Sequence, residues 1–226
     1  MPKALFVEIE AKSGSEAETV GFLKAALDTA KNEPDTRDWY ALRFDERHFA
    51  IFDTFDGQLG RLKHMAGEIG RSLVFKSFTS LNGLPDMSSS EIVAAKLPNG
   101  TAQAKLALYV PIETKLGQGR DFGEFLVAAK ALADAEAGTL AWYALRIGPN
   151  SFAIVDFFGD EASRDAHLQG KIAAGIGEQV GRYLDAMPEI RKAEVLASKQ
   201  SGWESIASAE KKMHPEQSVR IGPETI

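Results

Sequence analysis

The hydrophobic and polar positions of the chain change their period in a regular order. Residues 5–10 form a short run rich in strand-forming side chains. Between residues 20 and 30, apolar side chains recur every three or four positions, which predicts an amphipathic helix that ends near Pro34. Residues 39–44 and 49–55 flank a polar turn, and this arrangement predicts a β-hairpin.

A second helical region and a final strand complete the pattern. The expected apolar face of the helical region carries Leu59 and Leu62 together with His64. The final strand is expected at residues 92–96. This order of elements, β-α-β-β-α-β, is typical of the ferredoxin-like fold, in which the helices cover one face of an antiparallel sheet.

The whole pattern is repeated after a shift of 103 positions, which takes Trp39 to Trp142. The shift needs no gap, and about a third of the aligned positions are identical. The final strand of the second copy is expected at residues 195–199. The buried face of its second helical region is expected to consist of Ile172, Ile176, Val180 and Leu184. Duplication of one α+β unit is the economical explanation.

Each sheet would leave one face uncovered unless it packed against the other. A covalent duplicate supplies the second sheet at high effective concentration, and the linker around Pro98 is short and rich in turn residues. We therefore expect tandem ferredoxin-like repeats that form one intramolecular dimeric α+β barrel. The expected domains are repeat 1 at residues 1–98, repeat 2 at 104–200, and a polar C-terminal tail at 201–226.

Composition limits the class of protein. The 226 residues include 44% hydrophobic side chains, which is enough to fill substantial cores. The formal net charge is -6, and Lys and Arg are scattered among acidic residues, so nucleic acid is not an expected partner. No stretch is typical of a signal peptide or a membrane span. We expect a soluble, cytoplasmic protein that does not bind membranes.

The available chemistry is limited as well. The chain has no Cys, which excludes disulfides, thiol catalysis and Cys-ligated metals. Its four His residues, at positions 48, 64, 167 and 214, are too dispersed to predict a metal cluster. The sequence contains no phosphate-binding loop, nucleophile elbow or zinc-binding helix. Most hydrolase and kinase classes are therefore disfavoured, and no metal site is expected.

Several stretches of the second half are similar to a known family. They are residues 142–146, 152–158 and 161–168, followed by a closing strand within 190–197. With these stretches, each half resembles the antibiotic-biosynthesis-monooxygenase (ABM) family of dimeric α+β barrels. The resemblance covers about nine-tenths of the chain. It consists of apolar positions with a few anchor residues, so it specifies the fold better than the chemistry.

The resemblance implies a barrel made of two units, with a pocket between sheet and helices in each. The superfamily includes monooxygenases that oxidise quinols or polycyclic phenols without metal or flavin, heme-degrading enzymes, and proteins with no assigned activity. Its heme-degrading members carry an Asn on the first strand and a Trp followed by a His in the second helical region. Here the first strand offers Glu8 or Pro111, and His64 or His167 takes the place of that Trp. Heme cleavage is therefore disfavoured.

One set of polar residues is repeated in both copies. Its expected catalytic members are Asp53 with His64, and Asp156 with His167. Arg61 shares a helix face with His64, and strand alternation groups Asp53 with apolar neighbours. A carboxylate in such a position needs a partner from the helix or a neighbouring strand. The expected substrate-binding members are Arg43, Arg61, Trp39, Arg146, Arg164 and Trp142.

This set allows two interpretations. An imidazole oriented by Asp and close to Arg could take the phenolic proton of a quinol, and the resulting anion could react directly with oxygen, without a bound cofactor. Alternatively, the charged side chains form an internal ion pair that only ties helix to sheet. For Trp39 and Trp142, the alternatives are an aromatic wall for a flat substrate and ordinary core packing. Strand alternation places Trp39 and Tyr40 on opposite faces.

The expected function is therefore a cofactor-independent monooxygenase that oxidises a small aromatic or quinol-like molecule with molecular oxygen. The alternative is a non-catalytic barrel that binds a small ligand or serves as an assembly module. Burial of Asp53 and His64 without an adjoining cavity would favour the alternative. The sequence leaves open whether one or both pockets work, and whether two chains pair in a further homodimer.

Overall fold

The computed structural model describes residues 1–98 and 102–200, so the expected tail at 201–226 and part of the linker lie outside the described residues. The described strands are β1 (Lys3–Glu10), β2 (Thr36–Arg43), β3 (His48–Phe55), β4 (Asp86–Lys96), β5 (Leu106–Glu113), β6 (Thr139–Arg146), β7 (Ser151–Phe158) and β8 (Arg191–Lys199). The described helices are α1 (Glu16–Lys31), α2 (Gln58–Met65), α3 (Glu68–Thr79), α4 (Gly119–Ala135), α5 (Glu161–Leu168) and α6 (Lys171–Glu178).

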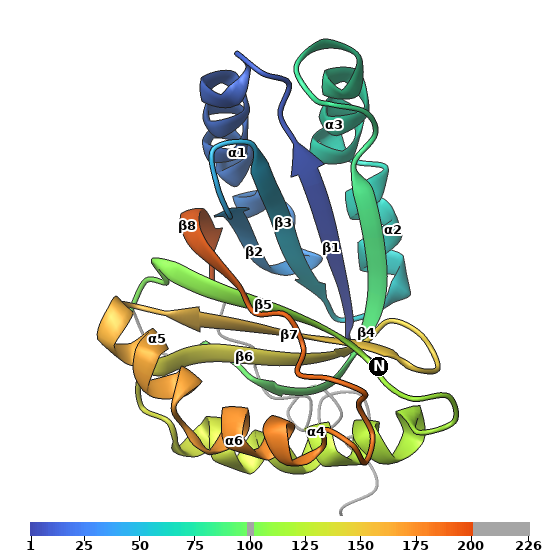
Figure 1. Cartoon of the computed structure of the whole chain (residues 1–226). Coiled ribbons are helices and arrows are strands. Elements are labelled where there is room, and N and C mark those ends of the chain that lie inside the picture. The colour runs from blue at the N-terminus through green and yellow to red at the C-terminus, as the bar shows by residue number, and fades with distance from the viewer. Residues whose placement is uncertain (99–101, 201–226) are drawn as a thin grey trace, which may run out of the picture.

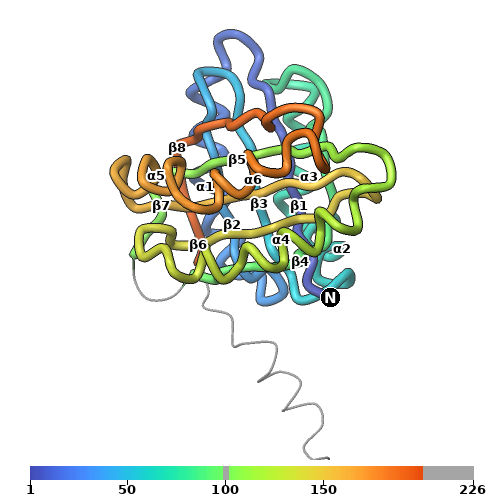
Figure 2. The backbone as a smooth tube through the Cα atoms, turned by 60° about the horizontal axis from the view of Figure 1, so that its bottom comes forward, coloured from blue at the N-terminus to red at the C-terminus, as the bar shows by residue number. Residues whose placement is uncertain are grey.

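The strands close into one antiparallel barrel in the order β1-β3-β2-β8-β5-β7-β6-β4. The last strand of each copy lies at the junction of the two copies. Strand β4 pairs with β1 of its own copy and with β6 of the other, and β8 pairs with β5 and β2 in the same way. Helices α1–α3 and α4–α6 lie on opposite sides of the barrel (Figures 1 and 2). The expected α+β class and closed barrel are confirmed.

The barrel interior is an apolar core to which both copies contribute. Tyr40 stacks on Phe157 with ring centroids 3.7 Å apart, and Phe6 stacks on Tyr109 at 4.0 Å. Both pairs join one residue of the first copy to one of the second. Because contacts of this kind fill the interior, each copy buries the face of the other copy's sheet.

Two outer cores lie between the sheet and the helices, one in each copy. In the first copy, Leu23 of α1 and Ile69 of α3 pack against the outward face of the strands. Trp39 belongs to this outer core, whereas Tyr40 faces the barrel interior. The expected alternation along β2 is therefore confirmed.

The second helical region differs from the expectation in both copies, because it consists of two short helices. In the first copy the chain turns between α2 and α3 at Gly67, where a Cβ would lie 2.9 Å from the carbonyl oxygen of His64. The expected apolar face was also wrong. Leu59 and Leu62 are 67% and 51% exposed, whereas His64 and its helix neighbour Arg61 are buried. The polar partners of these two side chains, rather than apolar packing, decide which face of α2 turns inward.

In the second copy, the expected helical face extended too far. Helix α6 ends at Glu178, so Val180 and Leu184 lie beyond it. In the turn that follows, Gly181 has a φ of 84°, a left-handed conformation that glycine adopts readily and that is incompatible with regular helix. Leu184 is nevertheless buried in the outer core. Leu184 is therefore apolar because the turn that carries it is buried, and not because it lies on a helix face.

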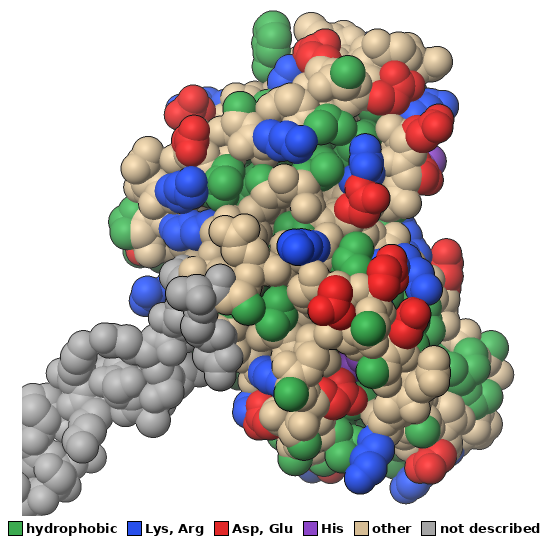
Figure 3. Space-filling view, turned by 90° about the vertical axis from the view of Figure 1, so that its left-hand side faces the viewer, with side chains coloured by type: hydrophobic (Ala, Val, Ile, Leu, Met, Phe, Trp, Pro, Cys, Tyr) green, Lys and Arg blue, Asp and Glu red, His purple; other side chains and the backbone are tan. Residues whose placement is uncertain are grey.

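The surface carries charges of both signs. On the face drawn in Figure 3, basic and acidic side chains are interspersed with apolar ones. This arrangement matches the scattered charge pattern of the sequence. Within the described residues, no helix is both long and apolar enough to cross a membrane.

Because the barrel interior combines both copies, we expect them to unfold together. Phe157→Ala removes a ring stacked on Tyr40 and should lower the free energy of unfolding by about 3–5 kcal/mol. Trp39 and Trp142 report on separate copies. In a Trp203→Phe background, we compare one protein that keeps only Trp39 with another that keeps only Trp142. Their urea transitions, followed by fluorescence, should coincide, and Phe157→Ala should shift both. A shift confined to one reporter would contradict the shared core.

Candidate functional site

His64 lies at the centre of a row of three ionisable side chains in the first copy. It projects from α2, and its Nε2 is 3.1 Å from Oδ2 of Asp53 on β3. Its Nδ1 is 2.5 Å from Oε2 of Glu33, which follows α1. The hydroxyl of Thr36 donates to the same Glu33 oxygen at 2.7 Å. We call Asp53, His64 and Glu33 the first row.

The second copy repeats this arrangement. Nε2 of His167 is 3.3 Å from Oδ2 of Asp156, and its Nδ1 is 2.6 Å from Oε2 of Glu136. Thr139 donates to the same Glu136 oxygen at 2.8 Å. We call Asp156, His167 and Glu136 the second row. The structure thus brings together each expected Asp and His pair and adds a glutamate on the far side of the imidazole.

Sequence reasoning missed the two glutamates and the two threonines. Glu33 and Thr36 coincide with Glu136 and Thr139 under the 103-residue shift. They were overlooked because they flank the turn between the helix and β2, where polar residues are common. The available signal was their identity in both copies. A glycine is also kept beside each row, and a Cβ at Gly170 would lie 2.9 Å from Oε1 of Glu136.

Each glutamate is positioned by a lysine from the other copy. Nζ of Lys199, at the end of β8, donates to the backbone carbonyls of Glu33 and Thr36 at 2.8 and 2.6 Å. Nζ of Lys96, at the end of β4, donates to the backbone carbonyl of Glu136 at 2.6 Å. Both lysines also bind the last turn of the preceding helix, where a cation is favourable. The exchange of last strands therefore completes each site.

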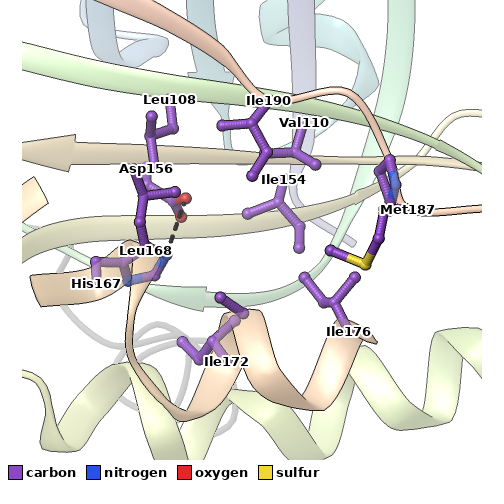
Figure 4. Close-up of a pocket in the computed structure, with 12 residues that line it drawn as sticks. Leu108, Val110, Ile154, Asp156, His167, Leu168, Ile172, Ile176, Met187 and Ile190 are labelled. Carbon is purple, nitrogen blue, oxygen red and sulfur yellow. Dashed lines mark ion pairs between the residues drawn. The ribbon is translucent and has the colours of Figure 1, made fainter. Parts of the chain in front are cut away.

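An apolar cavity adjoins each row on the aspartate side. In the second copy it has a volume of about 30 Å³ and lies between the sheet and α6, with Ile154 and Ile172 on opposite walls. Figure 4 shows the carboxylate of Asp156 directed toward His167 at one end of this cavity. The corresponding cavity of the first copy has a volume of about 70 Å³, and Asp53 and His64 line it. We call these spaces the inner cavities.

One oxygen of each aspartate is left without a partner. Oδ1 of Asp53 and of Asp156 is buried and accepts no hydrogen bond from the described residues. Burial raises the pKa of both carboxyl groups, and the adjacent imidazoles oppose that rise. Each free oxygen can therefore accept a hydrogen bond or a proton from a hydroxyl group in the inner cavity.

The two histidines are held in the charged form. Burial by itself would lower the pKa of His64, but the neighbouring Asp53 and Glu33 outweigh burial and raise the pKa to about 10. In the same way, Asp156 and Glu136 raise the pKa of His167 to about 9 against the effect of burial. An imidazolium has no free lone pair at neutral pH. The raised pKa values therefore do not favour the expected use of the imidazole as the proton acceptor, and that role stays a prediction.

Two of the expected arginines support the backbone instead of the rows. Nη1 of Arg61 donates to the carbonyls of Ala4 and Ser90 at 3.3 and 3.4 Å, which ties α2 to β1 and β4. Nη1 of Arg164 donates to the carbonyl of Ala193 at 3.5 Å. Among the described contacts, neither guanidinium is hydrogen-bonded or ion-paired to a row.

The other two arginines lie at the far end of their strands. Arg43 forms an ion pair with Glu194 of the second copy, and the guanidinium of Arg146 lies 5.4 Å from the ring centroid of Phe152. The hairpin register places Arg43 opposite Phe49, four residues along β3 from Asp53. Their expected role in binding substrate stays a prediction.

The tryptophans are next to the aspartates. In the hairpins, Trp39 lies directly opposite Asp53 and Trp142 directly opposite Asp156. Both rings are fully buried in the outer cores, and their Nε1 atoms have no partner among the described residues. A role in core packing is therefore evident. A role toward substrate stays a prediction.

The remaining histidine of the described chain is peripheral. His48 is exposed and pairs with Asp45 at 2.9 Å in the hairpin turn. Over residues 1–98 and 102–200, no group of three or more His, Asp or Glu side chains is arranged to hold a metal ion.

Comparisons with known proteins support the fold. No family model and no curated protein matches the sequence. A candidate monooxygenase from Fusobacterium nucleatum has a TM-score of 0.77 at 17% identity, over 89% of this chain and 95% of that one. An anthrone oxidase-like protein has a TM-score of 0.62 at 11% identity, over 90% and 94%. A heme-degrading enzyme from Listeria monocytogenes has a TM-score of 0.51 at 7% identity, over 85% and 98%.

At identities of 7–17%, these likenesses show that the chain shares its fold with the three proteins. The neighbours named above differ in their described activities, so the fold alone does not choose among them.

The charged histidines predict how stability depends on pH. Their folded pKa values, about 10 and about 9, lie above the ordinary value of 6.5. The imidazolium contribution to the free energy of unfolding is therefore complete below pH ~6.5 and is lost as pH rises through the folded values. A His64→Gln, His167→Gln double variant should show a flatter decline in urea midpoint over this window, whereas His48→Gln should follow the wild type. Neutral imidazoles in ¹⁵N NMR spectra at neutral pH would contradict the assignment.

The crossed lysines predict an effect between copies. Lys199→Met should loosen the Glu33 turn and lower the pKa of His64 while leaving His167 unchanged, because Lys199 contacts only the first copy's turn. Lys96→Met should do the reverse. Imidazole ¹⁵N titrations of both variants would measure these shifts. Equal changes at the two histidines, or changes within the lysine's own copy, would contradict the crossed support.

Proposed function

We propose that the protein is a monooxygenase that oxidises a small aromatic or quinol-like substrate with molecular oxygen and needs no bound cofactor. The observation that carries the proposal is the free Oδ1 of Asp53 and Asp156 beside an apolar cavity. Apolar walls suit an aromatic ring, and one buried acceptor suits a single phenolic hydroxyl. The neighbours described as a candidate monooxygenase and as anthrone oxidase-like support it through their shared fold.

The reaction begins with loss of a substrate proton. A carboxylate whose pKa is raised by burial is a suitable base. Oδ1 of Asp53 takes the proton of the hydroxyl or of an activated ring carbon, and the electron pair stays on the substrate as a delocalised anion. The adjacent imidazolium of His64 stabilises this charge in a site of low dielectric. In this proposal His64 and His167 thus supply positive charge beside the carboxylate and do not take the substrate proton themselves.

Oxygen chemistry follows on the substrate itself. The anion gives one electron to oxygen, and the resulting radical pair joins to form a carbon–oxygen bond. The peroxide takes back the proton held by Asp53, and the oxygen–oxygen bond breaks as water leaves. A CH₂ group and O₂ are thereby converted to a carbonyl group and H₂O. Apolar walls around the cavity exclude solvent from the anion.

The size of the cavities bears on the alternative function. Volumes of about 70 and 30 Å³ hold one or a few waters and not an aromatic ring. Substrate entry therefore requires α3 or α6, with the segment that follows it, to move outward. The alternative, a barrel that binds a small ligand without reaction, is favoured by these small volumes and would be recognised by binding without oxygen uptake.

We further propose that the chain is a fused dimer of two ferredoxin-like repeats, at 1–98 and 104–200. The duplicated element order and the crossed strands β4 and β8 support this division. In a non-covalent dimer of such units, each last strand and its lysine would come from the partner subunit. The fusion supplies both within one chain.

Oxygen uptake with a panel of quinols and anthrone-like phenols tests the function. We expect substrate-dependent uptake, with one oxygen atom of ¹⁸O₂ appearing in the product. Asp53→Asn, Asp156→Asn should lower kcat by about 10²- to 10⁴-fold, because asparagine cannot accept the proton. The single variants would show which copy works.

His48→Ala serves as the control, since its side chain is exposed and remote from both inner cavities. The proposal fails if the wild type consumes no more oxygen than the double variant across the panel. Binding of the same phenols without oxygen uptake would select the ligand-binding alternative.

A further inference from the structure

Each imidazole separates two different environments. On the Nε2 side of His167 lies Asp156, which is 1% exposed and lines the inner cavity. On the Nδ1 side lies Glu136, whose side chain is 23% exposed. In the first copy, Asp53 and Glu33 have the same relation, with side-chain exposures of 0% and 22%. Each row therefore runs from a buried cavity to the protein surface.

A second space adjoins the second row on its outer side. It has a volume of about 400 Å³, and its lining includes Glu136, Thr139 and His167 together with Lys171 at the start of α6. We call it the outer cavity. His167 lines both this cavity and the inner one, so the imidazole is the partition between them.

We propose that each row is a proton relay that connects the inner cavity to solvent through the imidazole and the glutamate. The role of the relay as a route for the substrate proton rests on the proposed function. Proton transfer between the inner cavity and solvent does not itself require turnover. In the second copy the 2.6 Å contact between Nδ1 and Glu136 allows proton transfer, and the 3.3 Å ion pair between Nε2 and Asp156 couples the charge of that carboxyl group to the ring.

The relay works without any proton crossing the ring. When Asp156 takes a proton from the substrate hydroxyl, its negative charge moves away from Nε2 onto the delocalised anion. His167 then holds its Nδ1 proton less strongly, and that proton passes to Oε2 of Glu136 and on to water. The imidazole is left neutral with its Nε2 proton still directed at Asp156. One proton has entered at the cavity and one has left at the surface, and the reverse sequence returns it.

The charged groups around His167 are consistent with this direction of transfer. Asp156 comes from β7, and Glu136 comes from the turn after α4. Lys96 of β4 holds the Glu136 backbone, and Lys171 of α6 lines the outer cavity. On α5 itself, Arg164 is paired with Glu161 and Asp165 with Lys192. Glu136 is thus the acceptor in contact with Nδ1, and it has access to solvent.

The two copies differ at the outer end of the row. Gly138, Ser163 and Ala166 surround the outer cavity of the second copy. The 103-residue shift places Asp35, Gly60 and Lys63 there in the first copy. Asp35 and Lys63 form an ion pair of 2.8 Å, and a Cβ at Gly60 would lie 3.2 Å from Cβ of Asp35. A Cβ at Gly138 would lie 2.9 Å from Cβ of Ser163. Each copy therefore has a glycine where the other has a side chain. In the first copy the Asp35–Lys63 ion pair lies at the positions that Gly138 and Ala166 take in the second copy.

Exchange of the imidazole N–H protons with water tests the relay without substrate. The probe is ¹⁵N-histidine-labelled protein, with signals assigned by His64→Gln and His167→Gln, and water-saturation transfer as the measurement. At about pH 6 both imidazoles of the wild type are charged, and in each glutamine variant the adjacent aspartate still favours the charged form. Glu136→Gln should slow exchange at His167 at least tenfold and leave His64 unchanged. Glu33→Gln should do the reverse, so each copy is the control for the other.

Swapping the residues at the outer end of the row between the two copies tests whether the proton leaves through the outer cavity. Formate, as a small proton carrier, should accelerate exchange at His167 more than at His64. Gly138→Asp, Ser163→Gly, Ala166→Lys should remove that acceleration, and Asp35→Gly, Gly60→Ser, Lys63→Ala should create it at His64. Thermal melting would verify that the variants are folded.

Three results would overturn the relay. The first is imidazole proton exchange that the glutamine substitutions do not change, and the second is proton exchange that rises steeply at low urea, as it does when the whole protein opens. The third is formate acceleration that does not respond to the swapped triplets. Normal relay exchange in a protein that consumes no oxygen would overturn only the proposed function.

Discussion

A carboxylate on the buried face of a strand is costly unless a positive charge neutralises it, and in this protein that constraint is met twice. Asp53 and Asp156 are fully enclosed by apolar side chains, and each takes its countercharge from a histidine of the following helix. This pairing turns the polar edge of α2 inward and leaves Leu59 and Leu62 exposed. A glutamate on the other side of each ring also favours the charged form of the histidine. An inner cavity adjoins each Asp–His pair, and each pair has one aspartate oxygen without a partner among the described residues.

The same site also depends on how the two copies are joined. Each last strand leaves its own copy to pair with the other, and each delivers a lysine to the turn that carries the other copy's glutamate. The barrel interior is shared as well, through stacked pairs such as Tyr40 with Phe157. Each row therefore depends on a lysine of the other copy for its support. The proposed reaction in either inner cavity therefore depends on the other copy for structure.

Much of the fold could be predicted from the sequence because its signals were local and repeated. The alternation around Trp39 predicted the strands, and the helical spacing before Pro34 predicted the first helix. The ungapped shift between the two copies led to the closed barrel. The division of the second helical region at Gly67 could not be predicted, because it depends on the close approach of backbone groups to that glycine. The pairing of Asp53 with His64 followed from the cost of an unpaired buried charge. Glu33 was missed because it lies at a turn, where polar residues are common, and the role of Lys199 arises only when distant segments meet.

The central claim is that the free oxygen of the buried aspartate receives the hydroxyl of an aromatic ligand in the inner cavity. A crystal structure of the protein with a redox-inert phenol bound tests it most directly. The account predicts the ring between the sheet and α3 or α6, with its hydroxyl oxygen within about 3 Å of Oδ1 of Asp53 or Asp156. A phenol bound at another surface, or seated in the inner cavity with its hydroxyl turned away from the aspartate, would contradict it.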